Sequence, residues 1–254
     1  MLQCYDKLTP INAILTKDEL NIFYNLQSLS CHEVAGALIF NKYGKLQKYN
    51  AFFGGNDHMT WGHGHIIGYH THPYKNYVRR YAPPSYIDYK NKIKSTMFIY
   101  DKYKTDTVGI VFDSYGTWTF RLTPQLIQEL CKIKNKSKIN HIIKIIKNNT
   151  RILNIQLSQP KYIIDYKPNK NKFPKITLKQ YINKMKYILN PKKSNKKLGF
   201  IITFTPKGKK VIIPNVKQCT ETLKSLSKIY NIPPNIELKL LNTKYVNNKS
   251  KLKK

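Results

Sequence analysis

The sequence predicts an α/β protein: a mixed β-sheet with flanking helices, followed by a lysine-rich α+β region. In the first half, short apolar runs bounded by turn residues alternate with stretches of helical periodicity, which is typical of a mixed sheet. In the second half, apolar residues at helical spacing are separated by lysines. Hydrophobic residues make up 41% of the 254 residues, enough to bury a core and too many for a disordered chain.

The first half is predicted to begin with a helix over residues 16–28. Thr16 and Glu19 have the spacing of a capping box, and apolar residues recur on one side of the helix. Another helix is expected to start at Ser85, directly after two prolines. A tight turn is expected at residues 114–115. Strands are expected at residues 33–41, 45–53, 65–72, 95–101, 106–113 and 116–122.

The second half is predicted to contain helices and a hairpin. Apolar residues at helical spacing predict helices over residues 139–149 and 177–190, the second with Thr177 as its N-cap. Residues 198–216 are expected to form a β-hairpin that turns at Lys207 and Gly208, because two apolar runs flank a polar, glycine-containing segment. Between them, the proline- and lysine-rich residues 166–175 have the composition of a linker.

Positive charge is concentrated in the second half of a chain whose formal net charge is +32. Residues 1–122 carry 14 lysines and arginines against 9 acidic residues, and residues 123–254 carry 31 against 4. This asymmetry predicts two domains, 1–122 and 123–254. Two explanations of the excess stay open: binding to nucleic acid through residues 123–254, or AT-rich coding, which favours lysine together with Asn, Ile and Tyr.

A membrane-spanning or secreted protein is not expected. The sequence has no run of about 18 apolar residues, and its N-terminus lacks a basic segment followed by an apolar one. The cysteines lie far apart, with no CxxC pair and no disulfide-like spacing (Cys4, Cys31, Cys131 and Cys219). These features predict an intracellular protein of the cytoplasm or nucleus, with reduced thiols and no contact with a membrane.

One short window, GYHTHPYKNYVRRYAPPSYIDY at residues 68–89, concentrates side chains that bind metals. His70 and His72 are two apart on a predicted strand, so they project from the same face, about 6–7 Å apart at the backbone. Ser85 and Asp88 are three apart at a predicted helix start, which places them on one face of that helix. Two imidazoles and one carboxylate can hold zinc and leave a fourth position for water, as catalytic zinc sites do.

A hydrolytic metal site also needs a general base. Glu33 is the only glutamate between Glu19 and Glu129, and it opens the predicted strand EVAGALIF. A glutamate ahead of an apolar strand can accept a proton from water when it faces a metal. It is also a common solvated strand end, and the residue alone does not separate these two interpretations.

Taken together, Glu33 in EVAGALIF, then GYHTHP, then PSYID, resemble the motif of the JAMM (MPN-type) zinc metalloproteases. That motif is an acidic residue ahead of a glycine-containing strand, then H-[ST]-H-P, then S-x-x-D. The resemblance covers roughly residues 12–122, and the three parts rarely occur together in this order. The family is best known for isopeptidases that remove ubiquitin or related modifiers from proteins, so the resemblance implies an MPN-type fold and a protein substrate, such as a ubiquitin conjugate.

The resemblance also implies a role for each motif residue. His70, His72 and Asp88 would bind Zn²⁺, and Glu33 would deprotonate the zinc-bound water. Ser85 would donate a hydrogen bond to the oxyanion, a role that also has a general electrostatic basis.

The sequence departs from the family pattern at one point. The family has seven residues between the proline and the serine, whereas eleven separate Pro73 from Ser85 here. A loop can absorb four additional residues at small thermodynamic cost. The segment either faces the substrate or is merely tolerated; its aromatic and basic residues are Tyr74, Lys75, Tyr77, Arg79, Arg80 and Tyr81.

Two alternatives to a metallopeptidase remain. The first is a catalytically inactive scaffold of the same fold, although such domains often lose a ligand or the base and this chain keeps all five residues. The second is a nucleic-acid-binding protein that acts through residues 123–254, although no recognisable reader motif is present there.

Overall fold

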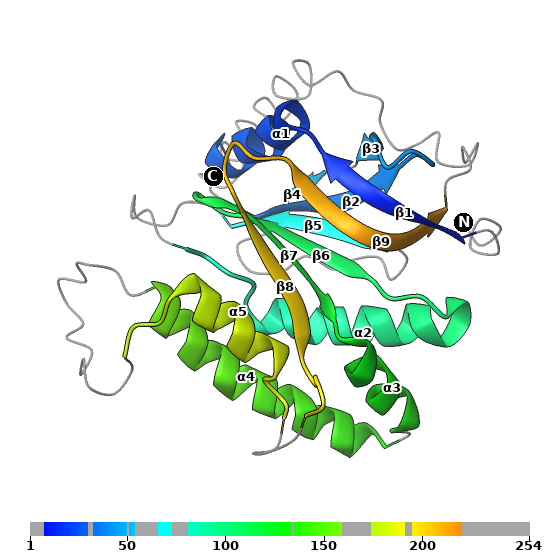
Figure 1. Cartoon of the computed structure of the whole chain (residues 1–254), viewed down its shortest axis with the longest axis vertical. Helices are drawn as coiled ribbons and strands as arrows, with labels where there is room; N and C mark the ends of the chain where they lie inside the picture. The colour runs from blue at the N-terminus through cyan, green and yellow to red at the C-terminus, as the bar shows by residue number, and fades with distance from the viewer. Residues whose placement is uncertain are drawn as a thin grey trace, which may run out of the picture.

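The computed structural model describes residues 8–29, 33–49, 51–53, 66–72, 81–133, 135–158, 174–190 and 195–219. Figure 1 shows how its helices and strands are arranged. In chain order they are β1 (Leu8–Leu15), α1 (Lys17–Leu29), β2 (Val34–Phe40), β3 (Leu46–Tyr49), β4 (Phe52–Phe53), β5 (Ile67–Thr71), α2 (Tyr86–Tyr103), β6 (Val108–Phe112), β7 (Gly116–Leu122), α3 (Pro124–Lys132), α4 (Lys136–Ser158), α5 (Leu178–Lys186), β8 (Phe200–Pro206) and β9 (Val211–Cys219).

The main sheet confirms the predicted mixed α/β class. Its strands follow the order β3-β2-β5-β6-β7-β8, and β4 also pairs with β2. β5 and β6 are parallel, and the other neighbouring pairs are antiparallel. Two parallel neighbours need a crossover connection, which α2 provides. α2 follows β5 in the chain, and its first turn lies near the carboxyl end of β5, the side of a parallel pair where α/β proteins commonly bind ligands.

Two hydrophobic cores lie on opposite faces of this sheet (Figure 1). One is built with α1 and the β1–β9 pair, and the other with helices α2 to α5. The alternation of side chains along β6 separates them, since Ile110 and Phe112 enter the first core and Val111 enters the second. Along β5, Tyr69 likewise enters the first core, so the next side chain, His70, faces α2.

The helix starts form where the capping residues predict them. Thr16 N–H donates to Glu19 Oε2 at 2.7 Å, and Glu19 N–H donates to Thr16 Oγ at 3.3 Å. Thr177 is the N-cap of α5, and its capping-box partner is Gln180. These local hydrogen bonds satisfy backbone donors that a helix start leaves open, which is why they can be predicted from a few residues.

The strand predicted at residues 95–101 is wrong, because these residues continue α2. Their β-branched and aromatic side chains favour a strand. In the folded chain, however, Thr96 and Ile99 extend a buried stripe that begins at Tyr89 and Ile93, with helical spacing. Burial against the sheet therefore outweighs the local preference, and Thr96 Oγ is paired with Thr107 Oγ at 2.7 Å.

The hairpin predicted over residues 198–216 is also wrong, although the chain turns where expected. Gly208 takes a left-handed φ of 87° at that turn. β8 then pairs with β7, whereas β9 crosses to the other layer and pairs with β1. The turn residues predict a reversal of direction, but they carry no information about the strand that each arm joins.

The predicted division at residue 122 does not coincide with a break in either sheet. β7 pairs with β8 along its whole length, from Gly116 opposite Pro206 to Leu122 opposite Phe200. β1, before residue 122, also pairs with β9, which lies after it. Residues 159–173, which include most of the predicted linker, lie outside the described ranges. Among the helices that are described, none is both long and apolar enough to span a bilayer.

Candidate metal centre

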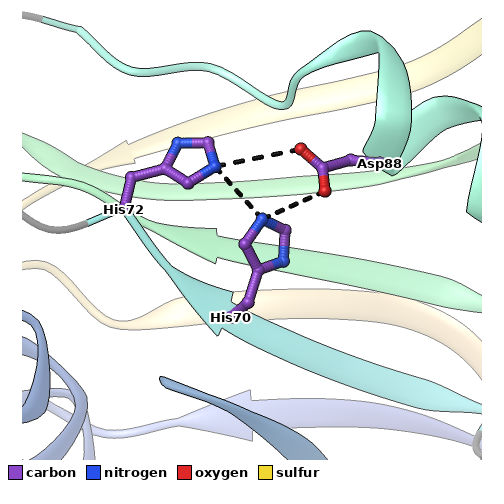
Figure 2. Close-up of side chains that lie close together, drawn as sticks. All are labelled: His70, His72 and Asp88. Carbon is purple, nitrogen blue, oxygen red and sulfur yellow. Dashed lines mark hydrogen bonds and ion pairs between the residues drawn. The ribbon is translucent and has the colours of Figure 1, made fainter. Parts of the chain in front are cut away.

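His70 and His72 project from the carboxyl end of β5 toward α2, as Figure 2 shows. The residues between and before them point the other way. Tyr69 packs edge-on against Phe23 of α1, and Thr71 Oγ accepts a hydrogen bond from Val34 N–H at 2.9 Å. Tyr69 thus packs in the core on the other face of the sheet, and Thr71 is hydrogen-bonded to the adjacent strand. Because side chains alternate along a strand, these contacts fix the face on which both imidazoles lie.

Asp88 enters the site from the first turn of α2. Ser85 is the N-cap of this helix, and Ser85 N–H donates to Asp88 Oδ2 at 2.6 Å. Ser85 Oγ in turn accepts from Asp88 N–H at 3.4 Å. This reciprocal pair is a capping box with an aspartate in the third position, and it holds the carboxylate over the helix start. The Ser-x-x-Asp spacing therefore has a structural cause as well as a chemical one.

The ligand atoms of His70, His72 and Asp88 converge on one point (Figure 2). The two Nε2 atoms lie 3.1 Å apart. His70 Nε2 is 3.2 Å from Asp88 Oδ1, and His72 Nε2 is 3.8 Å from Asp88 Oδ2. A tetrahedral ion with bonds of about 2.0–2.1 Å separates its ligand atoms by roughly 3.3 Å. The three atoms can therefore hold a metal ion, and no other such group occurs within the described part of the chain.

The tautomer of His72 follows from its hydrogen bond to the backbone. His72 Nδ1 lies 2.8 Å from the carbonyl oxygen of Ala82. A carbonyl oxygen can only accept, so Nδ1 must carry the hydrogen. In the neutral ring the lone pair then belongs to Nε2, the atom that faces His70 and Asp88. Gln27 Nε2 donates to the carbonyl of His72 at 3.0 Å and fixes the same residue from α1.

The pKa values of the three side chains are shifted in different directions by their surroundings. Burial lowers the pKa of His72, and the neighbouring His70 lowers it further, so this ring is neutral near pH 7. Burial would also lower the pKa of His70, but Asp88 outweighs burial and raises it. The pKa of Asp88 would rise on burial, yet the charge and hydrogen bond of His70 hold it well below its usual range. The carboxylate is therefore ionised and ready to bind a cation.

Glu33 lies beside this group on the same face of the sheet. Ala35 pairs with His70 and Gly36 with Tyr69 in the antiparallel β2–β5 ladder. Continuing this register by two residues brings Glu33 opposite His72, and the alternation of side chains turns it toward the imidazoles. The Glu33 carboxylate accordingly acts to raise the pKa of both histidines.

Lys92 is a charged neighbour that sequence reasoning did not find. It follows Asp88 by one helical turn, is buried, and places its ammonium 5.7 Å from the centre of the Phe120 ring. Burial lowers the pKa of Lys92 to about 7, against the opposing charges of Asp106 and Asp88. The sequence feature that could have indicated its burial is its position between Tyr89 and Ile93, two apolar residues at helical spacing.

The second half of the chain helps to place the start of α2. Asn154 of α4 donates to the carbonyl of Pro84 at 3.1 Å, and the Tyr181 hydroxyl of α5 donates to Asn154 Oδ1 at 3.0 Å. Tyr181 also pairs with the hydroxyl of Tyr89 at 3.3 Å. The residues on either side of Ser85 and Asp88 are thus tied to helices that follow residue 122.

The described residues include all five that the sequence singled out: Glu33, His70, His72, Ser85 and Asp88. The three predicted metal ligands lie together, Ser85 caps the helix that carries Asp88, and Glu33, directly before β2, acts on both histidines through its charge. Of the long segment between Pro73 and Ser85, residues 74–80 lie outside the described ranges. No protein-family model matches the sequence, and no curated protein matches it.

Proposed function

We propose that this protein is a zinc metallopeptidase of the JAMM type that hydrolyses an isopeptide or peptide bond. One observation carries the proposal: the Nε2 atoms of His70 and His72 and the carboxylate of Asp88 converge at the carboxyl end of β5, with separations of 3.1, 3.2 and 3.8 Å. Glu33, which directly precedes β2, is close enough for its charge to act on both histidines. The sequence motif that predicts this chemistry and the convergence of the three side chains both support the proposal.

The donor set favours zinc over magnesium and calcium. Two imidazole nitrogens and one carboxylate oxygen suit zinc, whereas magnesium and calcium prefer oxygen ligands. Zinc held by three protein ligands would supply an acidified water and polarise the carbonyl of the scissile bond. His72 contributes a lone pair at Nε2 because its Nδ1 hydrogen is held by Ala82, and Asp88 contributes the negative charge.

The remaining residues move or stabilise charge. Glu33 accepts the proton of the attacking water at its carboxylate and can return it to the departing amine. Ser85 is half-buried next to Asp88 and can offer its hydroxyl hydrogen to the oxygen that becomes negative, because its Oγ receives rather than gives the capping hydrogen bond. A protein substrate with an isopeptide bond, such as a ubiquitin conjugate, fits this set of roles.

The function is tested by incubating zinc-loaded protein with a panel of ubiquitin chains that covers each lysine linkage, and with a peptide-linked fusion. Cleavage that stops when a chelator removes the metal supports the proposal. A protein that binds zinc tightly and cleaves no member of the panel would instead fit the inactive scaffold of the same fold.

Replacing Ser85 separates its two roles. Ser85→Ala is expected to lower hydrolysis by about 10²–10³-fold and to cost about 0.5–2 kcal/mol of folding stability through the lost cap. Thr177→Ala is the matched control, because it removes the equivalent cap of α5 away from the site. Equal rate losses in both variants would mean that Ser85 acts through stability alone. Rates with saturating substrate and thermal unfolding curves provide the two measurements.

We also propose nucleic-acid binding as a second candidate function. Glu129 is the only carboxylate side chain among the described residues from 123 to 219, and those residues carry many lysines. On α4, Lys144, Lys147 and Arg151 follow one another at intervals of three and four, which places them along one side of the helix. A polyanion would gain from such a surface by releasing condensed counterions.

The second candidate predicts salt-dependent binding that depends on α4. The intact chain should bind labelled single-stranded or duplex DNA at low salt and lose affinity by orders of magnitude at physiological salt. Changing Lys144, Lys147 and Arg151 to Gln should weaken binding and reduce the salt slope by about 2–3. A triple change of Lys17, Lys42 and Lys45 to Gln removes the same charge from the first half and serves as the control. Equal effects of both triple variants would contradict an α4 binding surface.

A further inference from the structure

Asp113 is a buried carboxylate that the proposed reaction does not use. It directly follows β6, and its side chain is 0% exposed. Oδ1 accepts from Tyr115 N–H and Gly116 N–H, each at 2.8 Å. Oδ2 accepts from Ala82 N–H at 2.9 Å and from Trp118 Nε1–H at 2.7 Å. The two oxygens therefore have four donors, which is how a buried carboxylate remains tolerable as an anion.

The two oxygens of Asp113 have different structural consequences. The bonds of Oδ1 close the turn between β6 and β7, which is a common use of an aspartate at this position. The hydrogen bonds of Oδ2 reach residues outside the turn. Trp118 lies on β7, and Ala82 belongs to the segment that leads into α2. A turn alone does not explain the second oxygen, and its partner Ala82 lies next to the metal centre.

Ala82 connects the buried carboxylate to a metal ligand. Its N–H donates to Asp113, and its carbonyl accepts from His72 Nδ1–H at 2.8 Å. Metal-binding histidines are generally oriented by a hydrogen bond from the ring nitrogen that does not bind the metal. Here the acceptor is a backbone carbonyl, so the orientation of His72 depends on what holds Ala82 in place.

We propose that Asp113 is a positioning residue of the metal centre: it holds Ala82 so that the Ala82 carbonyl fixes the ring and tautomer of His72. The inference rests on the metal centre proposed above and adds a residue outside the family-like motif. Its effect is on position, because the Ala82 N–H and carbonyl belong to different peptide units. Tyr81 is held from the same side, with its ring 5.0 Å from that of Tyr115 and 5.3 Å from that of Phe204.

This network is compatible with the long gap between Pro73 and Ser85. The partner of His72 lies three residues before Ser85, in the part of the gap that Asp113 anchors. Added length earlier in the gap therefore need not disturb the imidazole. The departure from the family spacing and the intact geometry of the ligands are compatible for this reason.

Asp113→Asn tests the proposal with little change in size. The amide can accept on only one side, so it cannot serve both the turn and the Ala82–Trp118 pair. Zinc affinity is expected to fall about 10–100-fold, measured by competition with a chromophoric chelator. The visible spectrum of the cobalt-substituted protein should also change, because it reports the arrangement of the ligands rather than the stability of the fold.

Trp118→Phe is the matched control, since it removes the other donor to Oδ2 and leaves Ala82 bonded to Asp113. It should lower the unfolding temperature while leaving zinc affinity within about threefold, well short of the loss expected when the hydrogen-bond partner of a metal-binding histidine is disturbed. Ala82→Pro deletes the N–H that Asp113 accepts and keeps the carbonyl, although its ring also fixes φ at this position. It carries the test if Asp113→Asn does not fold.

Wild-type zinc affinity and an unchanged cobalt spectrum in Asp113→Asn or Ala82→Pro would overturn the positioning role. Equal loss of zinc in Trp118→Phe would overturn it too, because general loosening would then explain the effect. A wild-type protein that binds neither zinc nor cobalt gives a different result, the failure of the metal centre itself.

Discussion

Glu33→Gln is expected to slow hydrolysis by about 10²-fold or more while the protein keeps its full complement of zinc. The amide retains the size and hydrogen-bonding capacity of the side chain but cannot take a proton from water. Glu33 is not among the three converging ligands, so its replacement leaves the metal donors unchanged. Turnover of a ubiquitin-chain substrate and metal content by mass spectrometry provide the two readouts.

Glu129→Gln is the control for this change, because it makes the same substitution on α3, where Glu129 pairs with Lys132 and Lys196. Its rate should equal that of the wild type. If Glu33→Gln hydrolyses substrate as fast as the wild type, the general base lies elsewhere and the proposed role of Glu33 is wrong.

His70→Ala and Asp88→Asn are each expected to abolish stoichiometric zinc binding, because the first removes one of three protein ligands and the second replaces the anionic ligand with a neutral amide. Asp88→Asn keeps an oxygen for the Ser85 N–H, so the cap of α2 can persist. His70→Ala leaves the buried carboxylate of Asp88 without the partner that lowers its pKa, and some loss of stability is expected as well.

His141→Ala provides the control for the metal measurement, since His141 is exposed on α4. Its zinc content should match that of the wild type. Circular dichroism confirms that each variant is folded before its metal is counted. Full zinc occupancy in both ligand variants would show that the ion binds at another site.

The residues of the site could be predicted because each depends on local chemistry. Alternation along a strand puts His70 and His72 on one face whatever the rest of the fold does. Ser85 and Asp88 form a capping box, and this motif is read from four consecutive residues. The same kind of signal at Thr16 and Thr177 placed two other helix starts correctly.

The fold predictions that were wrong concern segments whose structure is determined by tertiary contacts. Residues 95–101 have strand-like side chains, but packing of α2 against the sheet keeps them helical. The turn at Gly208 was visible, whereas the pairing of β9 with β1, far away in the sequence, was not. The residues around the ligands were missed for the same reason. Asp113 resembles an ordinary turn residue in sequence, and its bond to Ala82 spans 31 positions.

Anomalous diffraction at the zinc absorption edge, from crystals of the wild-type protein grown with zinc, would locate the ion itself. One strong peak is expected between His70 Nε2, His72 Nε2 and the Asp88 carboxylate, with bonds of about 2.0–2.2 Å and a remaining position open to water. Crystals grown with excess zinc that show no peak at these three residues, or show their strongest peak at other side chains, would contradict the proposed metal centre.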